Sequence, residues 1–110
     1  MKWEVILLEP AIVFLRSLNA KMRAKAFRSI ELLKQFGPEL PMPHSRKLVG
    51  SDLSELRVRL GSNICRLVYF FEGECVFVVT SGFVKKSHKT DRREIERALR
   101  IKTQYLEVKE

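Results

Sequence analysis

The chain has 110 residues, of which 45% are hydrophobic and 31% are charged. This composition is typical of a globular domain that buries a core without disulfides or metals, and it excludes a disordered chain. The 21 lysines and arginines against 13 acidic residues give a formal net charge of +8, which favours an anionic partner such as nucleic acid, an acidic protein or a membrane surface. No apolar run approaches the roughly 18 residues of a membrane span. We therefore expect one cytoplasmic domain, residues 1–110, that has no membrane partner.

The first predicted element is a strand over residues 3–8, where "WEVILL" is rich in β-forming residues. Glu9 and Pro10 end this apolar run, and no small-residue cleavage site follows. We interpret it as a strand and not as a signal peptide. Pro10 suits the first turn of a helix, which predicts a helix over residues 10–18.

A second helix is predicted over residues 20–36, with Asn19 as its N-cap. Apolar residues recur there at a spacing of three or four, and Gly37-Pro38 ends the helix. The apolar face holds Met22, Ala26, Ile30 and Leu33, and the opposite face carries Lys21, Lys25 and Arg28.

The second half of the chain predicts a loop, three strands and a last helix. Residues 38–47 hold three prolines and are predicted to be a loop. Strands are predicted over 53–60, 64–71 and 75–83, separated by turn sequences. Asp91 and Glu94 resemble a capping box at the start of a helix that places Ile95, Ala98, Leu99 and Leu106 near one face. The order β-α-α-β-β-β-α predicts an α+β fold with a mostly antiparallel sheet and helices packed against it.

Arginines are concentrated on one face of the predicted sheet. Arg57 and Arg59 are two residues apart and share a strand face. If the loop of the first hairpin has an even number of residues, Arg57 lies near Arg66 on that same face. Like charges across a strand pair are destabilising, and Glu55 would offset only part of the cost. The concentration of arginines on this face, despite its cost in stability, therefore indicates a functional role and not only a solubilising one.

The second predicted hairpin turns around Gly73, so two residues face each other when their residue numbers add up to about 146. Cys65 would then lie opposite Ser81 and Cys75 opposite Phe71, roughly 20 Å apart. A disulfide is excluded in this register, and buried reduced thiols are expected. Arg66 would lie close to Thr80 and Gly82. Lys85 and Lys86 would emerge beside the arginine face and complete a basic concavity.

Other charged and aromatic residues have simpler interpretations. Lys89, Arg92 and Arg93 are typical of a solvated face, and His44 in the proline-rich loop is expected to be incidental. The aromatic residues Trp3, Tyr69, Phe70, Phe71 and Phe77 are expected to pack in the core. Two cysteines and two histidines, widely scattered, do not make a zinc site, and no metal or small-molecule cofactor is expected.

Four short motifs in sequence order carry a family resemblance. "LSELR", "RLVYFF", "GFVKK" and "EIERA", within residues 46–99, resemble the RelE/HigB toxin superfamily, and more narrowly its phage-derived HigB-like branch. The resemblance implies a RelE-like fold and a toxin that cuts messenger RNA in the decoding site of the small ribosomal subunit. It also implies a cognate antitoxin protein as partner and catalysis without a metal.

The resemblance assigns roles to the basic residues. The ribose 2′-OH attacks the adjacent phosphate, so the site must move protons and stabilise negative charge. Arg66 matches the phosphate-binding arginine of the family, and Arg57 and Arg59 fall where RelE has lysines. No tyrosine follows the "GFVKK" segment until Tyr105, so the role of the tyrosine in RelE is unfilled. His88 is the nearby side chain with an intrinsic pKa suited to proton transfer at neutral pH. The predicted catalytic residues are Arg66, Arg59, Lys86 and His88, and the predicted RNA-binding residues are Arg57, Lys85, Lys89 and Lys47.

Two alternatives stay open from the sequence. A toxin of the same fold could inhibit DNA gyrase, although that branch lacks the basic catalytic set. The chain could also be a non-catalytic nucleic-acid-binding module. Loss of binding and loss of cleavage should coincide for an enzyme but not for a passive binder.

Overall fold

A computed structural model of the chain describes residues 3–41, 44–73, 75–85 and 90–109. It has the predicted α+β architecture, with three α-helices and a five-stranded sheet. None of the helices in these ranges is long and apolar enough to cross a membrane. The elements in chain order are β1 (Glu4–Leu7), α1 (Glu9–Ser17), α2 (Ala20–Phe36), the short 3-10 helix η1 (Gly37–Glu39), β2 (Ser45–Lys47), β3 (Ser54–Leu60), β4 (Asn63–Glu72), β5 (Val76–Val84) and α3 (Arg92–Lys109).

The sheet has the strand order β1-β5-β4-β3-β2. β1 pairs with β5 in parallel and every other neighbouring pair is antiparallel, so the prediction of a mostly antiparallel sheet is confirmed. The strand β2 was not predicted, because it has three residues and lies at the end of the proline-rich segment. The loop prediction for residues 38–47 is wrong in this part, and β2 covers only the Ser54–Leu56 part of β3.

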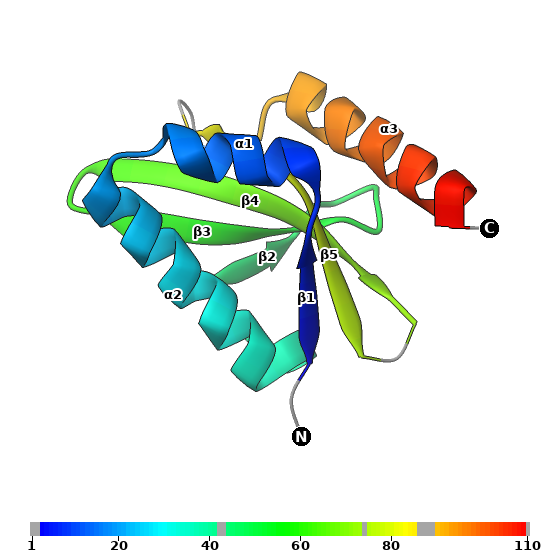
Figure 1. Cartoon of the computed structure of the whole chain (residues 1–110), viewed down its shortest axis with the longest axis horizontal. Coiled ribbons are helices and arrows are strands. Elements are labelled where there is room, and N and C mark those ends of the chain that lie inside the picture. Colours follow the sequence, from blue (N-terminus) through cyan, green and yellow to red (C-terminus); the bar gives the residue numbers. More distant parts are fainter. Residues whose placement is uncertain (1–2, 42–43, 74, 86–89, 110) are drawn as a thin grey trace.

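Helices cover both faces of the sheet (Figure 1). α1 and α2 lie on one face, where Leu15 and Leu33 pack against strand residues such as Leu67. α3 lies on the other face, where Ala98 packs with Val68 and Phe70. The alternation of side chains along β4 thus feeds two separate hydrophobic clusters.

The predicted helix boundaries agree with the local hydrogen bonding. The side chain of Asn19 accepts a hydrogen bond from the Met22 backbone N–H at 2.9 Å, as an N-cap does. α2 ends at Phe36, and Gly37 follows with φ of 58°, a conformation that favours glycine. Before α3, the Asp91 carboxylate accepts from the Arg93 N–H at 2.8 Å, whereas Glu94 does not complete the capping box.

Two details of the predicted core are wrong. The prediction puts Leu99 on the buried face of α3, but its side chain is 36% exposed and Tyr105 packs against the core instead. Phe71 is also exposed, at 44%, although Tyr69, Phe70 and Phe77 are buried as predicted.

The predicted register of the second hairpin is also wrong. Its ladder begins at Glu72 opposite Val76, and a bulge between Val68 and Tyr69 shifts it further. As a result Arg66 lies opposite Phe83, beside the Leu67–Gly82 pair, so it is close to Gly82 as predicted but not to Thr80.

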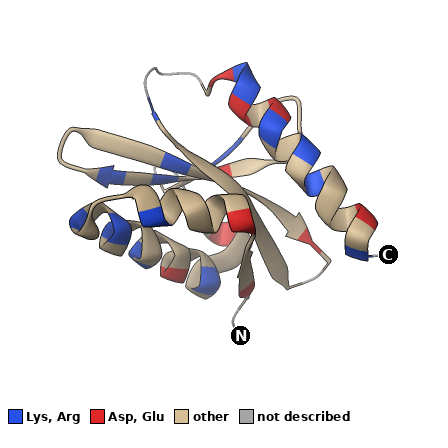
Figure 2. Cartoon of the chain, turned by 45° about the horizontal axis from the view of Figure 1, so that its top comes forward, with Lys and Arg blue, Asp and Glu red and all other residues tan. Residues whose placement is uncertain are grey.

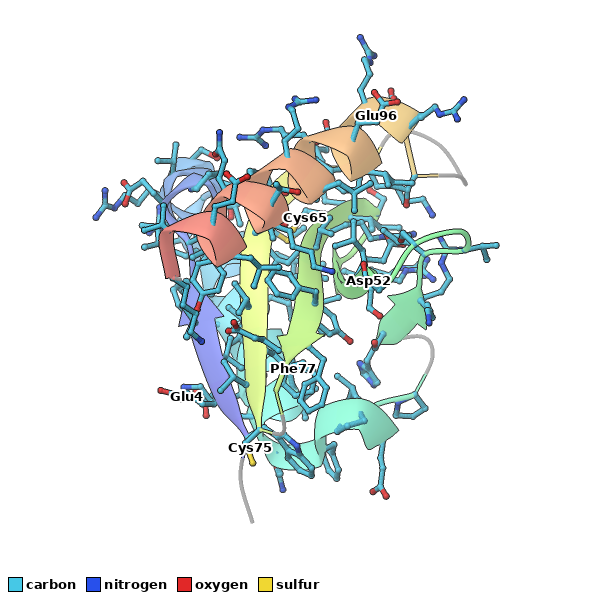
Figure 3. All side chains as sticks on the ribbon, turned by 90° about the vertical axis from the view of Figure 1, so that its right-hand side faces the viewer. Glu4, Asp52, Cys65, Cys75, Phe77 and Glu96 are labelled. Atoms are coloured by element: carbon cyan, nitrogen blue, oxygen red, sulfur yellow. The ribbon has the colours of Figure 1, made fainter. Side chains whose placement is uncertain are left out.

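The positions of the cysteines change with this register. Cys65 lies opposite Val84 instead of Ser81, and Cys75 precedes β5. Both thiols are free and lie toward opposite ends of the sheet (Figure 3). Cys65 is buried as predicted, but Cys75 is only half-buried.

Candidate functional site

Two arginines face each other across β3 and β4. Arg57 is directly opposite Arg66, in a hairpin whose ladder closes at Leu60 opposite Asn63. This is the pairing that the sequence predicts for an even loop. Two like charges at directly opposed positions are destabilising unless a counter-charge lies close by.

The counter-charge is Glu55, which is fully buried. Its carboxylate forms an ion pair with the guanidinium of Arg66, which is itself 3% exposed. Glu55 Oε1 also accepts a hydrogen bond from Arg46 of β2 at 2.9 Å, and Oε2 accepts one from the Thr90 hydroxyl at 2.7 Å. One carboxylate thus joins β2, β3, β4 and the segment that leads into α3.

The arginine pair is not fully satisfied by this carboxylate. Burial, and then the charge of Arg46, lowers the pKa of Arg66 from its usual value. The Nε atoms of Arg57 and Arg66 are buried and have no hydrogen-bond partner among the described residues. Unpaired buried donors are costly, so they mark this place as one suited to an anionic ligand.

Lys85 joins the cluster from the end of β5. Its backbone N–H donates to the Ile64 carbonyl at 3.0 Å, which holds the residue beside the β3–β4 hairpin. Partial burial lowers the pKa of Lys85, and the positive charges of the arginines nearby lower it further, first Arg66, then Arg57 and Arg46. We call Arg46, Arg57, Arg66 and Lys85, together with Glu55, the basic cluster. Its four cations outnumber its single carboxylate.

A cavity of about 520 Å³ adjoins the basic cluster, between α2 and the hairpin. Arg57 lines it together with Arg59, whose Nε donates to the Gly61 carbonyl at 3.1 Å. Lys25 and Arg28 line it from α2. Basic residues accordingly run along α2 and across the nearby end of the sheet (Figure 2).

The structure brings together only some of the residues predicted for the site. Arg57, Arg66 and Lys85 meet in the basic cluster, and Arg59 lines the adjoining cavity. Lys47 lies at the far end of β2, where its charge acts on Asp52. The remaining predicted residues, Lys86, His88 and Lys89, lie outside the described residues.

Five polar residues of this region were missed as site residues. Arg46 and Thr90 bind Glu55, and Lys25, Arg28 and His44 line the cavity, although His44 was expected to be incidental. Arg46 could not be placed because β2 was not predicted. Lys25 and Arg28 were recognised as a basic helix face, but their approach to β3 depends on how α2 packs.

The described side chains offer no metal site. No group of three or more histidine, cysteine, aspartate or glutamate residues in these ranges could hold a metal ion. What the arrangement offers chemically is a concentration of guanidinium and ammonium groups, which bind and neutralise phosphate.

Comparison with solved structures gives the same fold. The chain is similar to a double arginine-to-alanine mutant of the E. coli toxin RelE in the free state, with a TM-score of 0.65, 22% identity, and coverage of 91% of this chain and 97% of that one. It is similar to the E. coli RelBE toxin–antitoxin complex, with a TM-score of 0.58, 25% identity and coverage of 79% and 99%. The isolated E. coli RelE toxin gives a TM-score of 0.57, 25% identity and coverage of 90% and 98%.

Comparison at the level of sequence families is also specific. Among curated proteins none matches the chain. Residues 13–103 match the family described as "Phage derived protein Gp49-like (DUF891)", which is most of the chain. The chain therefore belongs to the Gp49-like family of phage-derived proteins, within the RelE/HigB toxin superfamily that its sequence resembles.

Proposed function

We propose that this chain is the toxin of a type II toxin–antitoxin system and that it cleaves messenger RNA on the ribosome. The observation that carries the proposal is the basic cluster, in which Arg57 and Arg66 face each other and Lys85 joins them. The fold of the chain and its similarity to the toxin RelE support the same assignment.

The proposed reaction needs no metal. The ribose 2′-OH attacks the adjacent phosphate, a cyclic phosphate forms, and the 5′-oxygen leaves as a hydroxyl group. Negative charge grows on the phosphoryl oxygens, and positive groups held in a partly buried site stabilise it more than they would in water.

The structure changes the role that we propose for Arg66. Its guanidinium is buried and paired with Glu55, so direct contact with a phosphate would require it to leave that carboxylate. We assign phosphate contact to Arg57 and Lys85, with Arg66 as a positioning residue whose charge reinforces theirs. Arg59 and Lys47 would contact the RNA further from the bond that breaks.

Proton transfer is assigned to lysine and histidine. Arginine keeps its proton and is a poor base. A lowered pKa makes the Lys85 ammonium a better acid than a free lysine, which suits protonation of the leaving oxygen. We retain His88 as the candidate base and Lys86 and Lys89 as phosphate-binding residues, and replacing His88 with Gln should slow cleavage if His88 takes the proton.

The proposed partners are messenger RNA on the small ribosomal subunit and an antitoxin. One of the similar structures is a complex of RelE with its antitoxin. This chain has a formal net charge of +8, so an acidic antitoxin segment would complement its surface. A ribosomal target would place the activity in the cytoplasm.

The experiment is cleavage of a messenger RNA in a purified translation system, with and without ribosomes. We expect cuts only when ribosomes are present, with the 2′,3′-cyclic phosphate and 5′-hydroxyl ends that attack by the 2′-OH produces. Folded protein that binds RNA but never cuts it would instead indicate a non-catalytic binding module.

A further inference from the structure

The cavity beside the basic cluster has walls of different character. On one side α2 contributes Lys25 and Arg28, which are three residues apart and so share a helix face. On the other side are Arg57 and Arg59 of β3, and His44, whose carbonyl accepts a hydrogen bond from the Arg57 backbone N–H at 2.8 Å. Leu32 adds an apolar surface to the wall, and the volume of about 520 Å³ lies within the range of small-ligand sites.

The charges in this cavity are uncompensated. Lys25, Arg28, Arg57 and Arg59 line it, and no carboxylate of the described residues does. Glu31 is the only acidic residue of α2, and it pairs with Lys34 at 3.2 Å instead. A sequence under selection for folding alone would gain by placing an acid here.

We propose that this cavity is a second phosphate subsite, which holds the ribose-phosphate of a nucleotide next to the one cleaved. Phosphate suits the four cations, and the half-buried Leu32 can pack against the sugar or base. This inference rests on the proposed function, because it takes the occupant to be the RNA substrate. It adds residues of α2, which the basic cluster does not include, to the substrate-binding surface.

Arg57 is the reason for choosing the substrate strand as occupant. It belongs to the basic cluster, where it acts on Lys85, and it also lines the cavity. A single strand that places its scissile phosphate at Lys85 can therefore continue past Arg57 to Arg28. Ribosomal RNA would offer the same phosphate chemistry, and binding measurements with free RNA and with empty ribosomes separate these two occupants.

The test compares two charge reversals of equal size. Arg28→Glu changes a residue of the cavity, and Arg100→Glu changes an exposed arginine of α3 that does not line it. Both lower the net charge by the same amount, and both residues are exposed, so the fold should persist. The probe is a fluorescently labelled, short single-stranded RNA, titrated without ribosomes by fluorescence anisotropy at several salt concentrations.

We expect Arg28→Glu to weaken RNA binding roughly tenfold or more and to reduce the slope of log K against log salt by about 0.7 for each phosphate that the protein no longer neutralises. Arg100→Glu should change affinity less than about twofold, and Arg28→Lys should keep most of it. A neutral pair, Lys25→Gln with Arg28→Gln, checks that the weaker binding does not depend on the new carboxylate.

Several results would overturn the subsite. Equal reductions in affinity for the two reversals would indicate a general charge effect. Unchanged RNA binding by Arg28→Glu, combined with weaker binding to empty ribosomes, would assign the cavity to ribosomal RNA. Absence of RNA binding by the unmodified protein would also overturn it. If the Arg28→Glu difference holds but the protein never cuts messenger RNA, the cavity is an RNA phosphate site and the proposed cleavage activity fails.

Discussion

Arg57 and Arg66 lie directly opposite each other on β3 and β4, and the buried carboxylate of Glu55 pairs with Arg66. Two like charges at directly opposed positions destabilise a sheet unless a counter-charge lies close by. Because Glu55 also binds Arg46 and Thr90, it holds together the elements that surround the basic cluster. Removing its charge should therefore be costly.

Replacing Glu55 with Gln should destabilise the protein by about 3–5 kcal/mol, because it leaves the buried charge of Arg66 without compensation. The measurement is the free energy of unfolding in urea. Combining Glu55→Gln with Arg66→Met removes both charges and should recover most of the stability, since no buried charge is then left unpaired. A double variant as unstable as Glu55→Gln alone would show that the ion pair with Arg66 is not what Glu55 contributes.

Lys85→Met should raise stability at neutral pH. Burial and the neighbouring arginines lower the pKa of Lys85 in the folded state, so the folded protein holds this proton less tightly than the unfolded chain. The charged ammonium of Lys85 therefore destabilises the fold. This loss of stability is fully present below the pKa of Lys85 in the folded state, and it disappears as the pH rises from that pKa to the pKa of lysine in the unfolded chain. The stability difference between Lys85→Met and the unmodified protein should therefore narrow over that alkaline range in urea unfolding. A difference that stays constant with pH would contradict this account.

Gly82→Ala should destabilise the fold although it adds one methyl group to a strand. A Cβ at Gly82 would overlap the side chains of Phe14 and Leu67, which pack α1 against β5 and β4. Overpacking of this kind costs about 1–3 kcal/mol, and the midpoint of thermal unfolding should fall by several degrees. An unchanged midpoint would mean that α1 can move away without a cost in stability.

The two thiols should differ in reactivity. Burial raises the pKa of Cys65 to about 11, whereas Cys75 is half-buried at the end of the sheet. A colorimetric thiol reagent should label one cysteine quickly in the native protein and both in denaturant, because the thiolate is the reacting form. Cys75→Ser should abolish the fast phase and Cys65→Ser should leave it intact. Fast labelling of both thiols in the native state would show that the sheet opens near Cys65.

The fold was largely predictable where one local signal was sufficient. Helix boundaries at Asn19 and Gly37 follow from capping chemistry that involves a few neighbouring residues. The Arg57–Arg66 pairing follows from the loop length of one hairpin. The register of the next hairpin does not, because its ladder already begins at Glu72 opposite Val76, and the further shift comes from a bulge at Val68 and Tyr69 that has no sequence signal as strong as a turn.

The candidate site was harder to predict than the fold, because its parts come from distant elements. The basic residues of β3 and β4 are recognisable from strand parity and family motifs. The bond of Thr90 to Glu55 spans 35 positions, and Arg46 reaches Glu55 through a strand too short to predict. The burial of Arg66 is likewise a tertiary property, which no pattern within β4 indicates.

The central claim is that the basic cluster cleaves messenger RNA, and one measurement tests it most directly. Primer extension would map cuts in a messenger RNA translated in a purified system with the unmodified protein, with Arg57→Met and with Arg100→Met. We predict ribosome-dependent cuts that fall by about 100-fold or more in Arg57→Met, as when one charge-stabilising donor is removed from an active site, and persist in Arg100→Met. Equal cleavage by the two variants, with both folded, would contradict the assignment of the cluster as the active site.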